Sequence, residues 1–564
     1  MLVRKRIIQV MFSFLALFMV LAAATGYHQL YNGPELARQA VAMRSKKVEL
    51  KEYPRGDILD RNLISLTSSQ QSQAVYFLFT RETSQTQNMK QVAAELSYAL
   101  GNISNQQVLQ KLKAGQKSGS TFVRIAMDLT SEQTARISRS SAAGLVVAPI
   151  SKRYGSEGFC AHLTGYISNK DNYKGQAGLE KVYDDILQKQ SSEQELVTVL
   201  DARGMAIQGL MFKIRQEQAS EQGTVVLTID RRVQQIVEEV IEDSLPKGAV
   251  VVLDIKTREI LAMASRPAFD QNKIEQALQM EENSPLINRA LNCYHPGSLF
   301  KILLAAAALA EEKVTLKDSF YCSGKININK EVAINCWQEE GHGEITFAEA
   351  FANSCNPAFI ETGLKLGRAD LLKYARQLKI TDPTVIGYPD CQVGSFIQIN
   401  AGQAALANAS IGQQGVMITP LQIASLIATI ADNGWYKSPS LVKYTVNSEG
   451  NRQNYSAGKG ERVLDAETAH AVQKLMEKCI SEGTGKSAAL NEVMVAGKTA
   501  TSQTGIIKEN QEVLNAWFGG YLPADEPRWA IVVLVEEGRS GAAEAAPIFK
   551  AIARKLLPLY SSSY

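Results

Sequence analysis

The chain has 564 residues, more than one hydrophobic core usually holds, so we expect at least two domains. Hydrophobic residues make up 45% and charged residues 21% of the sequence, which is typical of folded protein. The formal net charge of only +3 excludes the strongly basic composition of a nucleic-acid-binding protein, so no nucleic-acid partner is expected.

A basic cluster followed by an uncharged apolar stretch opens the chain. Arg4-Lys5-Arg6 precedes residues 7–25, which contain no charged side chain. A stretch of about 19 residues is long enough to cross a bilayer as one helix. The basic cluster favours a cytoplasmic tail at 1–6, with the rest of the chain exported. The alternative is a cleaved signal peptide, with Ala22-Ala23-Ala24 as the cleavage site.

Residues 26–222 form the expected N-terminal domain. Apolar residues at helical spacing predict one helix over 88–112. Residues 145–148 and 195–200 are typical of strands, and Pro149 is expected to end the first of them.

The pattern of elements changes at residue 223, where a second expected domain, 223–564, begins. Its first part predicts a strand at 225–230, a helix at 233–245 and a strand hairpin at 248–255 and 259–264. Its last part predicts strands at 493–503, 516–521 and 529–536, and a final helix at 546–557. Strands at both ends with helices between them indicate an α+β domain, with one sheet assembled from both ends beside a helical lobe.

Between these two groups of strands lies Ser298-Leu299-Phe300-Lys301, followed by the apolar run 302–310. Residues three apart share a helix face, so the amine of Lys301 can reach the hydroxyl of Ser298. A serine needs a base to become a nucleophile, and a lysine that desolvation or nearby positive charge keeps neutral can serve as one.

The S-x-x-K pattern is weak alone because three further copies occur, at Ser244/Lys247, Ser440/Lys443 and Ser456/Lys459. Proline or glycine disturbs each of the other three as a helix interior. Ser298 is the copy that opens a long apolar helix, whose N-terminus adds positive potential at the serine. A serine that merely starts a buried helix is the alternative.

Seven cysteines are present: Cys160, Cys293, Cys322, Cys336, Cys355, Cys391 and Cys479. An odd count leaves at least one free or paired between chains. Export permits disulfides, and Cys322 with Cys336 is the favoured pair; two small buried side chains are the alternative. The five histidines are scattered, so neither a metal site nor a cofactor is expected.

Two further motifs follow Ser298 in order. Ser354-Cys355-Asn356 is the one S-x-N in the sequence, and Lys498-Thr499-Ala500-Thr501 lies at an expected strand. Each alone is more typical of a turn or a strand end than of a site. Together and in this order they match the serine/lysine, S-x-N and K-T-G motif set of penicillin-binding proteins and serine β-lactamases.

The chain resembles the class B penicillin-binding proteins, the membrane-anchored peptidoglycan transpeptidases, along nearly its whole length. The supporting segments include residues 55–62, 162–166, 175–180, 227–230, 288–290, 294–301, 341–343, 412–415 and 419–420. The resemblance implies a pedestal or dimerisation-type domain at 26–222 and a transpeptidase domain at 223–564 with an antiparallel sheet. Nothing before residue 223 resembles the glycosyltransferase domain of class A relatives.

By this resemblance, Ser298 attacks a D-Ala-D-Ala stem peptide, and an amine of a neighbouring stem then takes the acyl group. Lys301 is the expected base, Ser354 the proton relay and Asn356 the group that holds Lys301 and the substrate amide. Lys498 is expected to keep the local potential positive. The backbone N–H groups of Ser298 and Thr501 are expected to bind the oxyanion.

Thr499 and Thr501 hydroxyls are expected to bind the substrate carboxylate, beside Ala500. The family usually has glycine where this chain has Ala500, and we expect its methyl to alter substrate fit without abolishing it. A lesser departure is Arg258, where relatives often have glycine; a hairpin tip should absorb it.

The charged residues Arg55, Asp57, Asp60 and Arg61 are interpreted as ion-pairing residues between subdomains, in preference to a partner site, and Glu180 as structural. Trp337 and His342 could equally line the cleft or lie on a surface loop. The resemblance also implies β-lactam acylation and a membrane glycosyltransferase partner. Division, elongation or sporulation, the acceptor and the oligomeric state stay open.

Three other functions are compatible with the motifs. A D,D-carboxypeptidase or β-lactamase would use water in place of the acceptor amine. A non-enzymatic scaffold for wall synthesis would have an impaired site, with Ala500 as its one support. A β-lactam sensor would need a larger cytoplasmic or multi-span region than residues 1–6 provide.

Overall fold

The computed structural model describes residues 2–50, 55–67, 70–79, 83, 86–119, 122–140, 142, 144–155, 158–168, 173–188, 194–199, 213–216, 223–280, 283–382, 384–388 and 396–561. By contacts, the chain divides into two compact units. The first comprises residues 1–54, 70–152 and 191–219, and the second comprises residues 55–69, 153–190 and 220–564. The expected boundary at 222/223 lies at the edge of the described residues.

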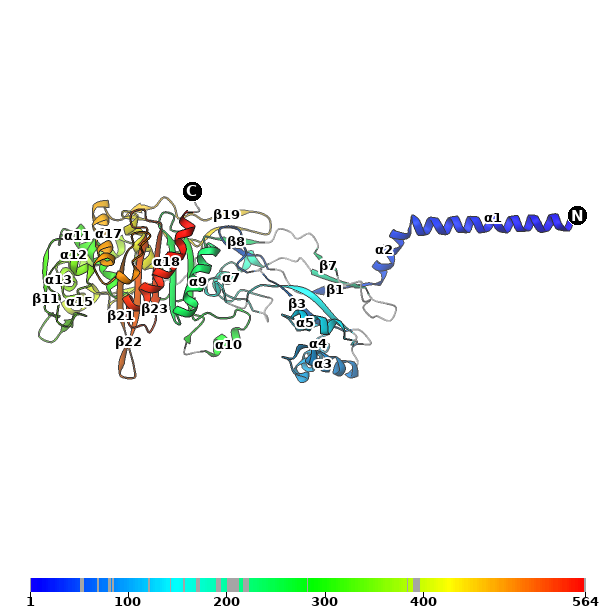
Figure 1. The fold of residues 1–564 in the computed structure, drawn as a ribbon, viewed down its shortest axis with the longest axis horizontal. Helices are drawn as coiled ribbons and strands as arrows, with labels where there is room; N and C mark the ends of the chain where they lie inside the picture. Colours follow the sequence, from blue (N-terminus) through cyan, green and yellow to red (C-terminus); the bar gives the residue numbers. More distant parts are fainter. Residues whose placement is uncertain are drawn as a thin grey trace. The chain divides into compact units, whose positions relative to one another are not determined.

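A long apolar helix begins the first unit. Helix α1 (Leu2–Leu30) contains Val3–Leu30, which is long and apolar enough to cross a membrane and includes the expected span 7–25 (Figure 1). Helix α2 (Gly33–Arg44) follows.

A three-stranded sheet with strand order β4-β3-β5 organises the rest of the first unit, with strands β3 (Gln70–Leu78), β4 (Phe122–Ala126) and β5 (Leu145–Lys152). Strand β5 continues through Pro149, so the expected end of the strand there is wrong. Because β5 is an edge strand, the missing N–H of proline can face its unpaired side.

The helix expected over 88–112 is two helices, α3 (Thr86–Leu100) and α4 (Asn105–Lys117). Gly101 takes a φ of 71°, which ends the first helix, and Ser104 caps the second through a capping box with Gln107. With α5 (Ser131–Ser138) these helices bury one face of the sheet. A second small sheet pairs β1 (Ser45–Leu50), β6 (Gln194–Val199) and β7 (Lys213–Gln216).

The second unit is built on a five-stranded antiparallel sheet, in the order β10-β9-β23-β22-β21. Its strands are β9 (Gly248–Asp254), β10 (Ile260–Arg266), β21 (Ala496–Lys508), β22 (Gln511–Leu522) and β23 (Trp529–Val535). Strand β23 lies between β9 and β22, which confirms a sheet assembled from both ends of the domain. The hairpin of β21 and β22 extends beyond the expected bounds.

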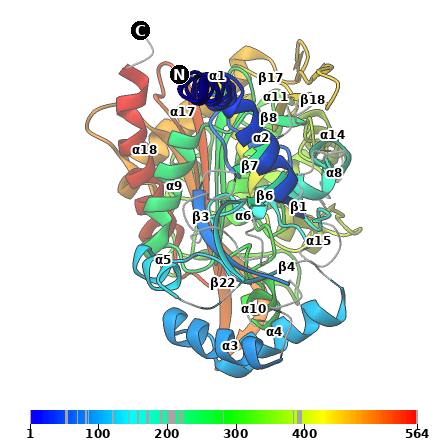
Figure 2. The same cartoon turned by 90° about the vertical axis from the view of Figure 1, so that its right-hand side faces the viewer.

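Helices cover both faces of this sheet. Helices α9 (Arg231–Ser244) and α18 (Ala546–Ser561) lie side by side on one face (Figures 1 and 2). On the other face, α16 (Pro420–Ala431) packs against β9, β22 and β23, and α17 (Ala466–Ser481) packs against β21. The α+β expectation is therefore confirmed.

The helical lobe adjoins this second face. Its helices are α11 (Lys301–Ala310), α12 (Phe347–Ala352), α13 (Asn356–Leu366), α14 (Arg368–Gln377) and α15 (Gln403–Ser410). Short helices elsewhere in the unit are α6 (Ala161–Thr164), α7 (Gly178–Val182), α8 (Asp184–Leu187) and α10 (Ile274–Gln279). Strands β2 (Ile58–Leu59), β8 (Thr224–Leu227), β18 (Val442–Val446) and β19 (Arg452–Asn454) form a four-stranded sheet.

The remaining short strands pair in twos: β11 (Ser319–Cys322) with β14 (Gly343–Thr346), β12 (Lys325–Asn327) with β13 (Ala333–Asn335), β15 (Phe396–Ile397) with β16 (Val416–Met417), and β17 (Trp435–Tyr436) with β20 (Glu461–Arg462).

Ion pairs hold segment 55–61 within the second unit. Arg55 Nε lies 2.6 Å from a carboxylate oxygen of Glu180, which is fully buried and also accepts from Tyr154 Oη at 2.8 Å. Arg61 pairs with Glu259 at 2.8 Å. These contacts confirm the ion-pairing interpretation of Arg55 and Arg61 and the structural interpretation of Glu180.

Arg258 is not an exposed hairpin-tip residue. It takes a φ of 61°, which suits the glycine that relatives often have, yet its side chain is fully buried. Its guanidinium lies 3.3 Å from Asp432 and donates to the carbonyl of Trp435 at 2.5 Å. The arginine that replaces glycine here is therefore accommodated by burial of its side chain and by its ion pair with Asp432, not by exposure to solvent.

Candidate active site

The nucleophile candidate lies where a tight turn enters a buried helix. Residues Gly297–Phe300 form one 3-10 turn (η2), and α11 begins at Lys301, so Ser298 lies one turn earlier than a regular helix start. Gly297 has a φ of 53°, and a Cβ there would meet the carbonyl oxygen of Thr501 at 3.0 Å. This close approach brings β21 beside Ser298, which keeps part of its surface exposed.

A chain of hydrogen bonds joins Ser298 to Lys301 through the S-x-N motif. Ser354 Oγ donates to Ser298 Oγ at 2.8 Å. Lys301 Nζ lies 3.4 Å from Ser354 Oγ and donates to the Ser354 carbonyl at 2.9 Å. The amine also donates to Asn356 Oδ1 at 2.8 Å. The first two motifs thus meet, with Ser354 between the serine and the lysine.

The S-x-N segment is a bend between two helices. Helix α12 ends at Ala352, α13 begins at Asn356, and Ser354 takes a left-handed φ of 58°. A non-glycine residue in this conformation stores strain on the order of 1–3 kcal/mol, which surrounding contacts must offset. The bend directs the Ser354 hydroxyl and the Asn356 amide to the same atom, Nζ of Lys301.

The surroundings of Lys301 favour the neutral form of its amine. Its side chain is fully buried, and burial, followed by repulsion from Lys498, lowers the pKa of Lys301 to about 7. Cys355 and Cys336 oppose this shift. A lysine near its titration point at neutral pH can accept a proton, as a general base must.

The third motif lies on strand β21. Lys498 is fully buried, its Nζ lies 5.8 Å from the ring centroid of Phe351, and burial lowers its pKa. Thr499 Oγ1 shares a 2.6 Å hydrogen bond with Thr484 Oγ1, and Thr501 Oγ1 accepts from the backbone N–H of Gly541 at 3.3 Å. Thr501 is exposed, as a residue that contacts substrate should be.

Ala500 is only 4% exposed and belongs to the core cluster that includes Leu299 and Trp517. In a strand, alternate residues face opposite sides, so Ala500 shares the buried side of Lys498, and Thr499 and Thr501 face the other. An effect of its methyl on substrate fit stays a prediction, and its burial favours a small one.

Within the described part of the chain, the other S-x-x-K pairs form no such chain of hydrogen bonds. Ser244 Oγ bonds the carbonyl of Val240, and Lys247 lies 2.7 Å from Glu537. Ser440 Oγ donates to a backbone carbonyl, and Ser456 accepts from a backbone N–H.

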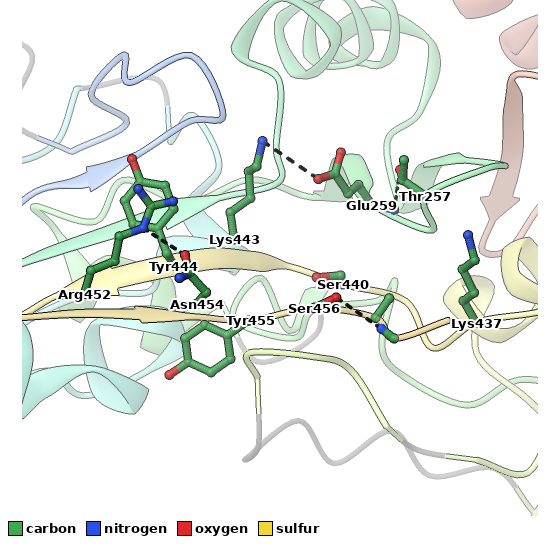
Figure 3. A pocket seen from close by; sticks show the side chains of 12 residues that line it. Thr257, Glu259, Lys437, Ser440, Lys443, Tyr444, Arg452, Asn454, Tyr455 and Ser456 are labelled. Atoms are coloured by element: carbon green, nitrogen blue, oxygen red, sulfur yellow. Dashed lines mark hydrogen bonds and ion pairs between the residues drawn. The ribbon is translucent and has the colours of Figure 1, made fainter. Parts of the chain in front are cut away.

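A cavity of about 410 Å³ in the second unit is lined by polar and charged side chains on and beside β18 and β19 (Figure 3). Figure 3 shows Lys443 extended toward Glu259, to which it is paired at 3.9 Å. None of the candidate catalytic residues lines this cavity.

The segment between α11 and α12 brings together side chains that lie apart in the sequence. Trp337 is 57% exposed and donates to the carbonyl of Asn353 at 2.9 Å. Its ring meets that of His342 edge-on at 5.6 Å, and His342 Nδ1 lies 3.6 Å from Cys336 Sγ.

Cys322 and Cys336 are both free, so the expected disulfide is wrong. Instead, their sulfurs, the sulfur of Cys355 and a ring nitrogen of His342 form one cluster, with all four potential ligand atoms within 4.8 Å of one another. The crowding of three cysteines and a histidine into residues 322–355 was the available signal. Cys391 lies outside the described residues.

Two family profiles match the chain. "Penicillin binding protein transpeptidase domain" matches residues 248–554, and "Penicillin-binding Protein dimerisation domain" matches residues 51–224.

Known proteins are similar over most of the chain. Stage V sporulation protein D of Bacillus subtilis is 30% identical across 99% of this chain and 86% of its own length. Peptidoglycan D,D-transpeptidase MrdA of Haemophilus influenzae is 27% identical across 84% of this chain and 80% of its own. The solved D,D-transpeptidase domain of a peptidoglycan glycosyltransferase from Eggerthella lenta, 25% identical, superposes with a TM-score of 0.60 over 74% of this chain and 94% of its own. The chain therefore belongs to the class B penicillin-binding proteins, the D,D-transpeptidases that cross-link peptidoglycan.

Proposed function

We propose that this protein cross-links peptidoglycan through an acyl-enzyme formed on Ser298. The observation that carries the proposal is the continuous hydrogen-bonded path from Ser298 Oγ through Ser354 Oγ to Lys301 Nζ, at 2.8 and 3.4 Å. A serine becomes a nucleophile when a base can take its proton, and this path supplies one.

In the first step, Ser298 Oγ attacks the carbonyl carbon before the terminal D-Ala of a stem peptide. The hydroxyl proton passes to the neutral Lys301 amine, directly or through Ser354. The C–N bond then breaks, and Ser354 relays a proton to the departing amine of D-Ala. In the second step, the amine of another stem attacks the ester, gives its proton to the same relay and releases Ser298.

Both steps pass through a tetrahedral intermediate with negative charge on oxygen. The N–H groups of Ser298 and Thr501 are the donors that we assign to this oxyanion, and the approach of Gly297 to Thr501 supports the assignment. Losing one such donor typically costs about 3–4 kcal/mol of transition-state stabilisation.

Substrate recognition falls to strand β21 and the S-x-N amide. The Thr499 and Thr501 hydroxyls would bind the stem-peptide carboxylate, which the Lys498 ammonium attracts. Asn356 Nδ2 donates to the carbonyl of Asn335 at 3.2 Å, which orients its amide oxygen toward Lys301. We assign Asn356 to holding Lys301 and the substrate amide.

The catalytic unit would act outside the cytoplasm. The apolar helix Val3–Leu30 begins with the basic cluster Arg4-Lys5-Arg6, which favours a cytoplasmic N-terminus and an extracytoplasmic domain. A transpeptidase needs newly polymerised glycan strands, so we propose a membrane glycosyltransferase as its partner. Residues 26–222 would serve as the pedestal and 223–564 as the transpeptidase domain.

Labelling of the full chain in detergent with a fluorescent penicillin tests the proposal. We expect lasting label on the parent, none on Ser298→Ala, and full label on Ser456→Ala, an exposed serine of another S-x-x-K pair. A parallel assay with stem peptide and acceptor amine should yield the cross-linked dimer. Rapid turnover of the drug would instead favour a hydrolase, and no label on the parent would favour a scaffold.

A further inference from the structure

A mostly buried carboxylate holds the segment that leads into Ser298. Glu536 directly follows strand β23, and its side chain is 13% exposed. Its Oε1 accepts a hydrogen bond from Tyr294 Oη at 2.5 Å and lies 3.0 Å from Nε of Arg289, whose side chain is 2% exposed. We infer that Glu536 is a positioning residue for the acylation of Ser298, acting through Tyr294, a role that rests on the proposed function.

The surroundings of Glu536 tie several segments together. Its second carboxylate oxygen lies 3.5 Å from Lys247 Nζ, and its backbone N–H donates to the Lys247 carbonyl at 2.8 Å. Arg289 uses its other nitrogens to donate to the carbonyls of Ser284 at 3.2 Å and Asn283 at 2.8 Å. A charge removed from water must be paired and hydrogen-bonded, so this carboxylate and the groups around it fix one another.

Tyr294 is held by its backbone, its ring and its hydroxyl. Its backbone N–H and carbonyl exchange hydrogen bonds with Ile418, at 3.1 and 2.9 Å. Its ring meets the ring of Trp517 edge-on, with the centroids 6.0 Å apart. Burial, followed by the Glu536 carboxylate, raises the pKa of Tyr294, so the hydroxyl stays protonated at neutral pH and donates the hydrogen bond. Hydrogen bonds from a hydroxyl to a carboxylate are among the short, strong ones.

Trp517 connects this anchor to the strand of the second oxyanion donor. Trp517 lies on β22, and its indole N–H donates to Ser502 Oγ at 3.2 Å on the neighbouring strand β21. Ser502 directly follows Thr501, whose N–H we assign to the oxyanion together with that of Ser298. Tyr294 stands four residues before Ser298. The position of Tyr294 against Trp517 therefore influences how the two oxyanion donors are aligned.

The anchor affects this alignment and not the formation of the turn. Leu299 and Phe300 are fully buried, and the Gly297 N–H donates to the carbonyl of Gly412 at 3.0 Å, so the turn persists without the Tyr294 hydroxyl. A displacement of about 1 Å can cost about 100-fold in rate. Oxyanion donors act on charge that develops in the transition state, so misalignment should lower the acylation rate and not the affinity for penicillin.

Tyr294→Phe tests this role, because it removes the hydroxyl and keeps both the ring and the ion pair of Glu536 with Arg289. The full chain in detergent is reacted with a fluorescent penicillin at increasing concentrations. This series separates the saturating acylation rate constant from the Kd of the noncovalent complex. We expect the rate constant to fall about 10-fold and the Kd to change less than about twofold, with the labelled fraction at completion equal to that of the parent.

The matched control is Tyr521→Phe. Tyr521 also lies on β22 and is fully buried, but its hydroxyl has no hydrogen-bond partner among the described residues. We expect this variant to acylate at the rate of the parent. Equal slowing of Tyr521→Phe and Tyr294→Phe would overturn the role, because the effect would then belong to any buried hydroxyl of this sheet.

Glu536→Leu removes the acceptor itself. Because Arg289 then lacks its partner in a buried site, we expect a smaller fraction of the protein to label. The chains that do label should acylate at least about 10-fold more slowly than the parent. The double variant with Tyr294→Phe should be no slower than Glu536→Leu, because the hydroxyl acts through this carboxylate. Effects that multiply in the double variant would overturn the pathway through Tyr294.

The remaining outcomes distinguish this role from the proposed function. A parent that acylates while Tyr294→Phe keeps the same rate constant would overturn the positioning role alone. A loss in Tyr294→Phe confined to the labelled fraction or to the Kd would also overturn it, because the hydroxyl would then serve only folding or binding. A parent that does not acylate at all would overturn the proposed function, and the positioning role with it.

Discussion

Lys301 should set the pH dependence of acylation. With a pKa of about 7, about half of the Lys301 amines are neutral at neutral pH. An exposed lysine, with a pKa of about 10.4, would be neutral in roughly 1 chain of 2,500 at that pH. The lowered pKa therefore raises the population of active base by roughly 1,000-fold.

The direction of the pH effect follows from the sign of the shift. Protonation of Lys301 removes the base, so acylation should fall about tenfold per pH unit below pH about 7 and level off above about 8. Because Lys498 is the second cause of the lowered pKa, after burial, Lys498→Met should move the rising part of the profile to higher pH.

The assay is the second-order rate constant for acylation by a penicillin, measured between pH about 5.5 and 9 on the parent and Lys498→Met. A flat profile, or one that rises only near the pKa of an exposed lysine, would refute the role of Lys301. A profile that Lys498→Met leaves at the same pH would refute the coupling between the two amines.

Three further substitutions test the proton relay, the buried methyl of Ala500 and the ion pairs of Glu180. Ser354→Ala should slow acylation by about 10²–10⁴-fold with the fold retained, because the relay to Ser298 is lost; a rate near that of the parent would exclude the relay. Ala500→Gly should change acylation less than about threefold and lower the unfolding free energy by about 0.5–1 kcal/mol, since the methyl is buried; a large gain in acylation would show that it contacts substrate. Glu180→Gln should cost about 3–5 kcal/mol in the denaturant-unfolding free energy, because Arg55 and Arg153 lose the buried carboxylate that they share; unchanged stability would contradict this.

The order of the three motifs predicted the site residues because each pattern is local in sequence. The predicted sheet and helical lobe are enough to bring the three motifs together. What the sequence did not reveal was the detail of the path: Ser354 lies between Ser298 and Lys301, through a left-handed bend that no propensity predicts.

The incorrect predictions about the fold have local physical causes. Pro149 was expected to end a strand, but whether proline is tolerated depends on which edge of a sheet the strand occupies. The helix over 88–112 was predicted as one because its apolar spacing resumes after the break at Gly101. The Cys322–Cys336 pair was predicted from proximity in sequence, and the convergence with Cys355 and His342 appears only in three dimensions.

The central claim is that Ser298 carries the acyl group. The most direct measurement is peptide mapping by mass spectrometry of the full chain after reaction with a penicillin. We expect a single adduct, on the peptide that contains Ser298. An adduct on a peptide with any other serine, with Ser298 unmodified, would contradict it.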